Sequence, residues 1–109
     1  MIITTTETIQ GKKIVRTLGL ARGNTIRARH IGRDIMALMR NIIGGEIHDY
    51  TKLLAESREQ SLDRMVADGK RLGANAIVSA RFATSVLMGG AAELLAYGTA
   101  VVVEDEQTG

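Results

Sequence analysis

The chain lacks cysteine altogether, which excludes disulfide bonds, thiolate metal sites and a thiol nucleophile at once. It also lacks proline, so no backbone N–H donor is missing from any element. Aromatic residues account for only 3% of the chain, so the core has to be aliphatic. No apolar stretch approaches the roughly 18 residues that span a bilayer, and residues 1–6 lack the pattern of a signal peptide. We therefore expect a soluble cytoplasmic protein.

The length and the charge distribution limit what the chain can be. A chain of 109 residues is expected to form a single domain, residues 1–109, with a core of moderate size. Residues 12–40 carry eight basic side chains and one acidic one, whereas residues 41–109 carry six basic and ten acidic ones. The basic first half can attract nucleic acid, or it can pair with the acidic second half of a neighbouring subunit. The pairing of subunits is the simpler interpretation.

The first thirty residues have the patterns of strands. Residues 2–6 are rich in β-branched side chains. Residues 13–21 and 25–29 are separated by the turn signal Arg22-Gly23-Asn24, and residues 25–29 alternate as a half-buried strand does. The pattern predicts a short first strand followed by a β-hairpin.

Helical spacing follows. Residues 31–42 place large apolar side chains at i, i+4, i+7 and i+8, and Gly44-Gly45 ends this helix. A longer helix is predicted from about residue 46 or 49 to residue 72. Gly73 reaches the left-handed conformation without a Cβ penalty, so it is predicted to cap that helix. The expected apolar face of the long helix consists of Ile47, Tyr50, Leu54, Leu62, Met65, Val66 and Leu72, with Ala55, Ser57, Ser61 and Gly69 as small interruptions.

Two strands are expected at residues 76–83 and 94–103, followed by a frayed tail at residues 104–109. Helices grouped beside hairpin strands predict an α+β fold: a two-layer sandwich of a mostly antiparallel sheet with one short and one long helix. Residues 77–78 and 101–103 are apolar on both faces of this sheet, and the long helix covers only one face. A ring of subunits that buries the second face is the simplest solution. Coverage by the N-terminal strand and first helix is the weaker alternative.

Three motifs point to a family through their order and spacing. They are residues 2–6 with Gly11-Lys12-Lys13-Ile14-Val15, the junction Leu72-Gly73-Ala74-Asn75-Ala76-Ile77-Val78, and the closing Gly98-Thr99-Ala100-Val101-Val102-Val103. Over nearly its whole length the chain resembles the YbjQ-like family of small proteins, which is described as heavy-metal-binding. The resemblance implies a dodecin-like sheet assembled as a ring of five subunits, and it implies no established reaction. Glu46 and Thr51 depart from the arginine and the acidic residue common in that family.

Two pairs of side chains are candidates for a metal site. His48 and Asp49 are adjacent, so they can hold one ion in a loop before the long helix but diverge within a helix. His30 and Asp34 share a helix face at i and i+4. Each pair supplies two ligands, and a ring can supply the others by symmetry; zinc or nickel suits these donors better than a soft metal does. The structural alternative is that Asp49 caps the helix and Asp34 neutralises a neighbouring cation.

Three arginines are candidates for an anion site. Arg27 and Arg29 alternate onto one strand face, and Arg33 follows within a helical turn. A guanidinium group binds phosphate through two oxygens at once. The aromatic side chains that stack on single-stranded nucleic acid are missing near these arginines, so sequence-specific nucleic-acid recognition is not expected. The alternative is that the arginines pair with acidic residues of a neighbouring subunit.

No set of residues indicates catalysis. Gly44-Gly45 and Gly89-Gly90 lack the spacing and the lysine of a phosphate-binding loop. We expect a non-enzymatic, ring-forming homo-oligomer with a ligand-binding or scaffold role, and the family resemblance adds metal binding. The alternatives are an anion or nucleic-acid binder that uses the arginine cluster, and a small-molecule carrier at the clefts between subunits. No membrane partner is expected.

Overall fold

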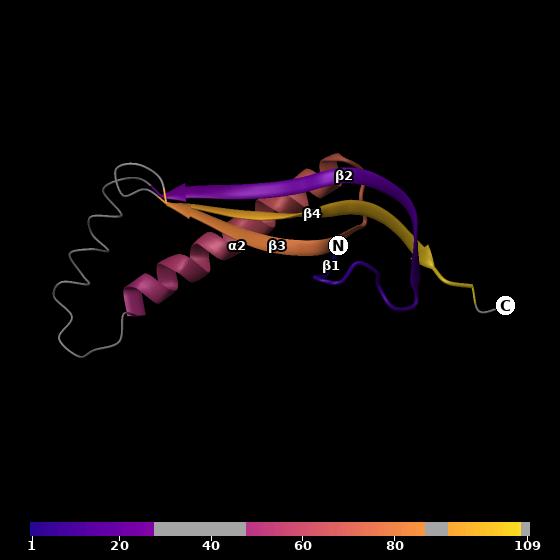
Figure 1. The fold of residues 1–109 in the computed structure, drawn as a ribbon, viewed down its shortest axis with the longest axis horizontal. Helices are drawn as coiled ribbons and strands as arrows, with labels where there is room; N and C mark the ends of the chain where they lie inside the picture. The colour runs from indigo at the N-terminus through magenta and orange to yellow at the C-terminus, as the bar shows by residue number, and fades with distance from the viewer. Residues whose placement is uncertain (28–47, 87–91, 108–109) are drawn as a thin grey trace.

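The computed structural model describes residues 1–27, 48–86 and 92–107, which form one helix on a four-stranded sheet (Figure 1). The elements are β1 (Ile2–Ile3), β2 (Lys12–Arg27), α2 (His48–Arg71), β3 (Ala76–Val86) and β4 (Ala92–Asp105). The strand order is β1-β3-β4-β2; the pairs β2/β4 and β3/β4 are antiparallel, and β1/β3 is parallel. The α+β prediction with a mostly antiparallel sheet is confirmed. The short helix predicted at residues 31–42 lies outside the described residues.

The predicted hairpin around Gly23 is wrong. The strand β2 runs without a turn from Lys12 to Arg27, and Arg22, Gly23 and Asn24 pair with residues 95–97 of β4. Gly23 was expected to supply a turn, but here it lets the backbone of α2 approach the sheet. A Cβ atom at this position would lie 2.6 Å from the Cβ of Arg64 and even closer to backbone atoms of Ser61 and Met65. Only glycine fits such an approach.

The buried face of α2 also differs from the predicted one. Among the helix residues from Leu54 onward, whose burial the structure describes, those buried are Ser57, Ser61, Met65 and Gly69, three of which were expected to be interruptions. Leu54, which was expected on the buried face, is 42% exposed. The reason is the close approach at Gly23: a helix whose backbone touches a strand can place only small side chains, or one flexible methionine, at the line of contact.

The junction from α2 to β3 is confirmed. Gly73 has a φ of 92°, its N–H donates to the carbonyl of Lys70 at 3.0 Å, and the N–H of Ala74 donates to the carbonyl of Gly69 at 3.0 Å. This pair of bonds is the Schellman arrangement that ends helices. The Asn75 side chain then joins the junction to β4, because its amide donates to the carbonyl of Val103 at 3.0 Å and accepts from the Val103 N–H at 2.8 Å.

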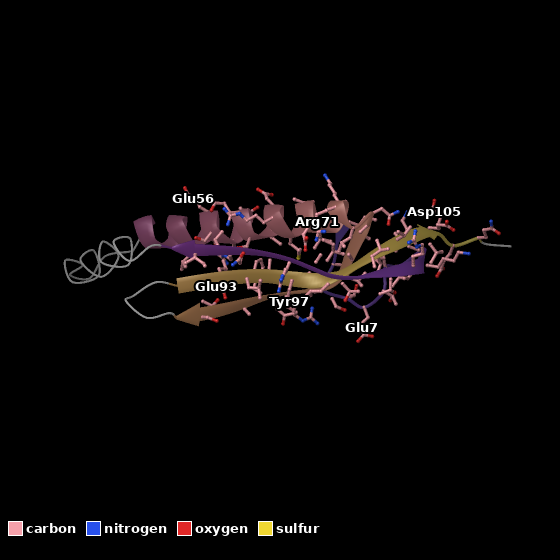
Figure 2. The ribbon with its side chains drawn as sticks, turned by 90° about the horizontal axis from the view of Figure 1, so that it is seen from above. Glu7, Glu56, Arg71, Glu93, Tyr97 and Asp105 are labelled. Carbon is pink, nitrogen blue, oxygen red and sulfur yellow. The ribbon has the colours of Figure 1, made fainter. Side chains whose placement is uncertain are left out.

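Two small cores lie on opposite faces of the sheet. The one beneath α2 consists of Ala21, Met65, Ile77, Ala80, Ala96 and Ala100. The other consists of Ala76, Val78, Val101 and Val103, with Ile9 packed against it. In Figure 2 the segment that carries Glu7 lies on the side of the sheet opposite α2. For these valines the structure shows part of the weaker alternative: Ile9 of the N-terminal segment packs against them, and the first helix lies outside the described residues.

The N-terminal segment is held by a bulge in β3. The N–H groups of Ser79 and Ala80 donate to the carbonyls of Thr6 and Thr4 at 2.8 and 3.0 Å, and the Arg81 guanidinium donates to the Thr5 carbonyl at 2.8 Å. Ser79 has a φ of 54°, an uncommon conformation for a residue with a Cβ, at a register shift between Val78 and Arg81. The bulge turns two backbone donors outward, and the N-terminal segment satisfies them.

Two helix side chains bind the outer edge of β2. The Asp68 carboxylate accepts from the N–H of Arg22 at 3.0 Å, and the Arg64 guanidinium donates to the carbonyl of Asn24. Asp68 also forms an ion pair with Arg71 at 2.7 Å. Side chains that occupy edge donors and acceptors block pairing with foreign strands.

A second ion pair joins the N-terminal end of β2 to the C-terminal end of β4. Lys12 bonds to Asp105, the last residue of β4, and this contact lowers the pKa of Asp105. The strand β4 therefore includes Glu104 and Asp105, which were expected to belong to the frayed tail.

The substitution Gly23→Ala tests the contact between α2 and β2. The added methyl group has no space against the helix backbone, so we expect a loss of about 2–4 kcal/mol in the free energy of unfolding. The control is Arg22→Ala, one residue away on the opposite face, for which we expect a change within about 0.5 kcal/mol. Urea unfolding monitored by circular dichroism measures both. Equal stabilities of the two variants would contradict this account of the contact.

The substitution Asp68→Asn tests the edge contact through pH. The hydrogen bond from Arg71, followed by that from the Arg22 N–H, lowers the pKa of Asp68 below 3.8. A lowered pKa stabilises the fold above about pH 4, and this contribution is lost as the pH falls through the folded-state value. We expect Asp68→Asn to cost about 1 kcal/mol at pH 7, since solvent screens part of the charge interaction, and we expect a smaller difference from the parent chain near pH 2. Urea titrations at both pH values decide; a pH-independent difference would contradict the electrostatic origin.

Candidate functional site

The sheet face opposite α2 is open along the C-terminal half of β2. Burial alternates there: Ala21, Gly23 and Thr25 are buried under the helix, and Leu20, Arg22, Asn24 and Ile26 are exposed on the other side. Leu20 is 57% exposed and Ile26 is 58% exposed. With a rise of about 3.3 Å per residue, the two side chains lie roughly 20 Å apart along the strand.

Leu95 and Tyr97 of β4, both half-buried, continue this open face beside β2. Asn24 pairs with Leu95, and Arg22 pairs with Tyr97. On its other side Tyr97 is paired with Arg81 of β3. Tyr97 therefore lies between two arginines, one on each of the neighbouring strands. We define the open face as Leu20, Arg22, Asn24, Ile26, Arg81, Glu93, Leu95 and Tyr97.

The charged groups of the open face are fixed by hydrogen bonds at two points. The Glu93 carboxylate accepts from the Asn24 side-chain amide at 3.1 Å, and the Arg81 guanidinium binds the carbonyls of Thr5 and Ala80, each at 2.8 Å. The open face therefore presents aliphatic and aromatic side chains together with a carboxylate, Glu93, and a guanidinium, Arg81, that are both held by hydrogen bonds. Such a mixture of apolar surface and opposite charges is typical of surfaces that bind protein.

The edge of β3 is also accessible beyond the N-terminal segment. The strand β1 pairs with β3 only at Ala76 and Ile77, and residues 81–85 of β3 are exposed. Phe82, the only phenylalanine of the chain, is 46% exposed there on the side of α2. It stands opposite Ala96 of β4, while α2 lies mainly over β2.

The predicted metal ligands fall at the margin of the described structure. His48 and Asp49 are the first two residues of α2, where successive positions are rotated by about 100°. This is the helical arrangement in which they were expected to diverge, and it differs from the loop that would let them hold one ion. His30 and Asp34 lie outside the described residues. Among the side chains that the structure describes, no three His, Asp or Glu residues gather closely enough to hold a metal ion.

The predicted anion site is only partly visible. Arg27 is the last residue of β2, and Arg29 and Arg33 lie outside the described residues. Their convergence stays a prediction. Arg22 and Arg81, which flank Tyr97 from separate strands, were not among the residues predicted from the sequence. The position of Arg81 depends on the bulge at Ser79, and no local pattern signals that bulge.

Comparison with known proteins decides the family. A family model described as "Putative heavy-metal-binding", YbjQ, matches residues 1–104. The chain belongs to the YbjQ family. It is 56% identical over 103 residues to a UPF0145 protein of Methanosarcina acetivorans, covering 94% of this chain and 97% of that one. It is 59% identical over 104 residues to a UPF0145 protein of Dehalococcoides mccartyi, covering 95% of this chain and all of that one.

A solved structure supports the fold of this YbjQ family member. It is a protein of unknown function from Pediococcus pentosaceus, assigned to the DUF74 family, with a TM-score of 0.62 and 15% identity. The match covers 95% of this chain and 98% of that one. At this identity the likeness concerns the fold alone. Within the described residues, no helix is long and apolar enough to cross a membrane.

Proposed function

We propose that this protein is a self-assembling scaffold, a homo-oligomeric ring of five subunits in the cytoplasm, in which the open face of each subunit packs against a neighbour. The exposure of Leu20 and Ile26 carries the proposal, because both aliphatic side chains are more than half in water. Complete burial of one such side chain is worth about 1.5–3 kcal/mol. A ring offers that burial to every subunit alike.

The charges of the open face support a second copy of the chain as the occupant. Arg22 and Arg81 lie on the same face as Glu93, so a neighbouring copy brings both signs of charge to the contact. The excess of basic residues in the first half of the chain and of acidic residues in the second half has the same consequence. Complementary charges of this kind set the register of an interface more than its strength.

The variant Ile26→Glu tests the ring. We expect the parent chain to have the mass of five subunits in native mass spectrometry and light scattering, and we expect the variant to shift toward smaller species, because the interface would bury an unpaired carboxylate. Ala67→Glu is the control, since it places the same charge on the exposed side of α2. A monomeric parent chain, or an Ile26→Glu variant with unchanged mass, would refute the proposed interface.

Metal binding is a second candidate, and the description of the family favours it. The chain has no thiolate to offer, so its donors are imidazole and carboxylate, which suit zinc or nickel. The residues that would hold the ion are His30 with Asp34, together with His48 or Asp49, which occupy successive, diverging positions at the start of α2. Each of the two predicted pairs supplies at most two of the four ligands of a tetrahedral site, and we propose that neighbouring subunits supply the others.

Thermal unfolding with Zn²⁺ or Ni²⁺ tests the metal site. At a metal concentration tenfold above Kd, binding adds about 1.4 kcal/mol, which corresponds to a rise in Tm of about 5 °C. We expect His48→Ala or His30→Ala to abolish this rise and Glu59→Ala, on the exposed side of α2, to preserve it. A rise that survives both histidine substitutions would exclude these ligands. If the Tm of the parent chain does not rise with either metal, the proposal of metal binding is refuted, and the proposal of a scaffold role is unaffected.

A further inference from the structure

A pocket of about 270 Å³ lies between α2 and the sheet. Its walls include Leu54, Ser57 and Arg58 from the helix and Thr25, Thr84 and Leu94 from three different strands. All of these residues belong to one chain. The pocket lies on the α2 side of the sheet and the open face lies mainly on the other side; Glu93, near the start of β4, borders both.

The pocket exists because small side chains face one another. The backbone of α2 touches β2 where Ser61 and Met65 approach Gly23. One helical turn before Ser61, the residue that faces the sheet is Ser57, and opposite it the strands present Thr25 and Thr84. These three side chains are too short to fill the space beside the contact. Close packing normally fills space of this size between a helix and a sheet, so the pocket leaves room for a ligand.

The polar groups in the floor of the pocket are already engaged. Thr25 and Ser61, 3% and 0% exposed, share a hydrogen bond of 3.3 Å, and the Ser61 hydroxyl donates to the Leu94 carbonyl at 3.0 Å. Throughout the described residues, every buried side-chain nitrogen or oxygen has a partner. The described residues of the floor therefore leave no buried polar side-chain atom that needs a hydrogen bond from a ligand. Leu54 and Leu94 supply apolar surface, and this favours an apolar ligand body.

Among the described residues that line the pocket, Arg58 is the one cation. The Arg58 side chain is exposed and has no ion pair or hydrogen bond with any described residue. The Glu93 carboxylate, which also borders the pocket, accepts a hydrogen bond from Asn24. An arginine in this position can bind a carboxylate through two parallel hydrogen bonds.

We propose that this pocket binds a small amphipathic anion, with its apolar part between Leu54 and Leu94 and its carboxylate at Arg58. The volume is at the lower limit of ligand sites, roughly 300–1,000 Å³, so the ligand is limited to a short chain or a single ring. This binding activity is additional to the scaffold role. It does not depend on the ring, since every residue involved comes from one subunit.

Octanoate is a suitable probe, and 1-octanol is its uncharged counterpart. We expect octanoate to bind the parent chain in isothermal titration calorimetry, and to shift the amide resonances of Thr25, Ser57 and Leu94. Thr84→Trp fills the pocket from its exposed rim and should abolish binding of both probes. Ser85→Trp is the matched control, because the next residue of the strand points to the opposite face and should leave binding unchanged.

The variant Arg58→Gln tests the charge. We expect octanoate to bind about fivefold more weakly, as is usual for an exposed ion pair, and octanol to bind as before. No octanoate binding to the parent chain, or equal binding by Thr84→Trp and Ser85→Trp, would overturn the site. Equal octanoate affinities of Arg58→Gln and the parent chain would overturn the assignment of an anionic ligand. Circular dichroism of each variant establishes that it is folded.

Discussion

The close contact between Gly23 of β2 and the backbone of α2 determines much of this structure. It explains why the helix buries serines, a glycine and a methionine while larger side chains lie at its margins. It brings Asp68 and Arg64 within reach of the backbone at the edge of β2. It also leaves the pocket, because side chains short enough for the contact are too short to fill the space one turn away.

The two faces of the sheet are covered by different means. The helix covers the first core, and the N-terminal segment, held at the bulge around Ser79, covers the second with Ile9. This segment reaches only part of the second face, so Leu20 and Ile26 remain in water. The positions of the exposed residues thus follow from how far two short covering elements extend. A second copy of the chain is the occupant that the mixed charges of the open face favour.

Membership in the YbjQ family and the structure bear on function in different ways. The family supplies the description of metal binding, whereas the described side chains show no cluster of three ligands. The open face and the pocket come from the structure and have no counterpart in the family's description. Their lining residues are common types, such as leucine, threonine and serine. What makes each site is the way in which the fold brings these residues together.

The sequence by itself determined the elements whose cause is local. The extent of α2, the cap at Gly73 and the strands after it follow from spacing and from one glycine conformation, so neighbouring residues sufficed to predict them. Only the tertiary structure decided the role of Gly23, the buried face of α2, the bulge at Ser79 and the meeting of Arg22 with Arg81 across Tyr97. The glycine of a turn and the glycine of a close helix contact look alike in a sequence. What distinguishes them is the partner surface, which long-range packing brings into place.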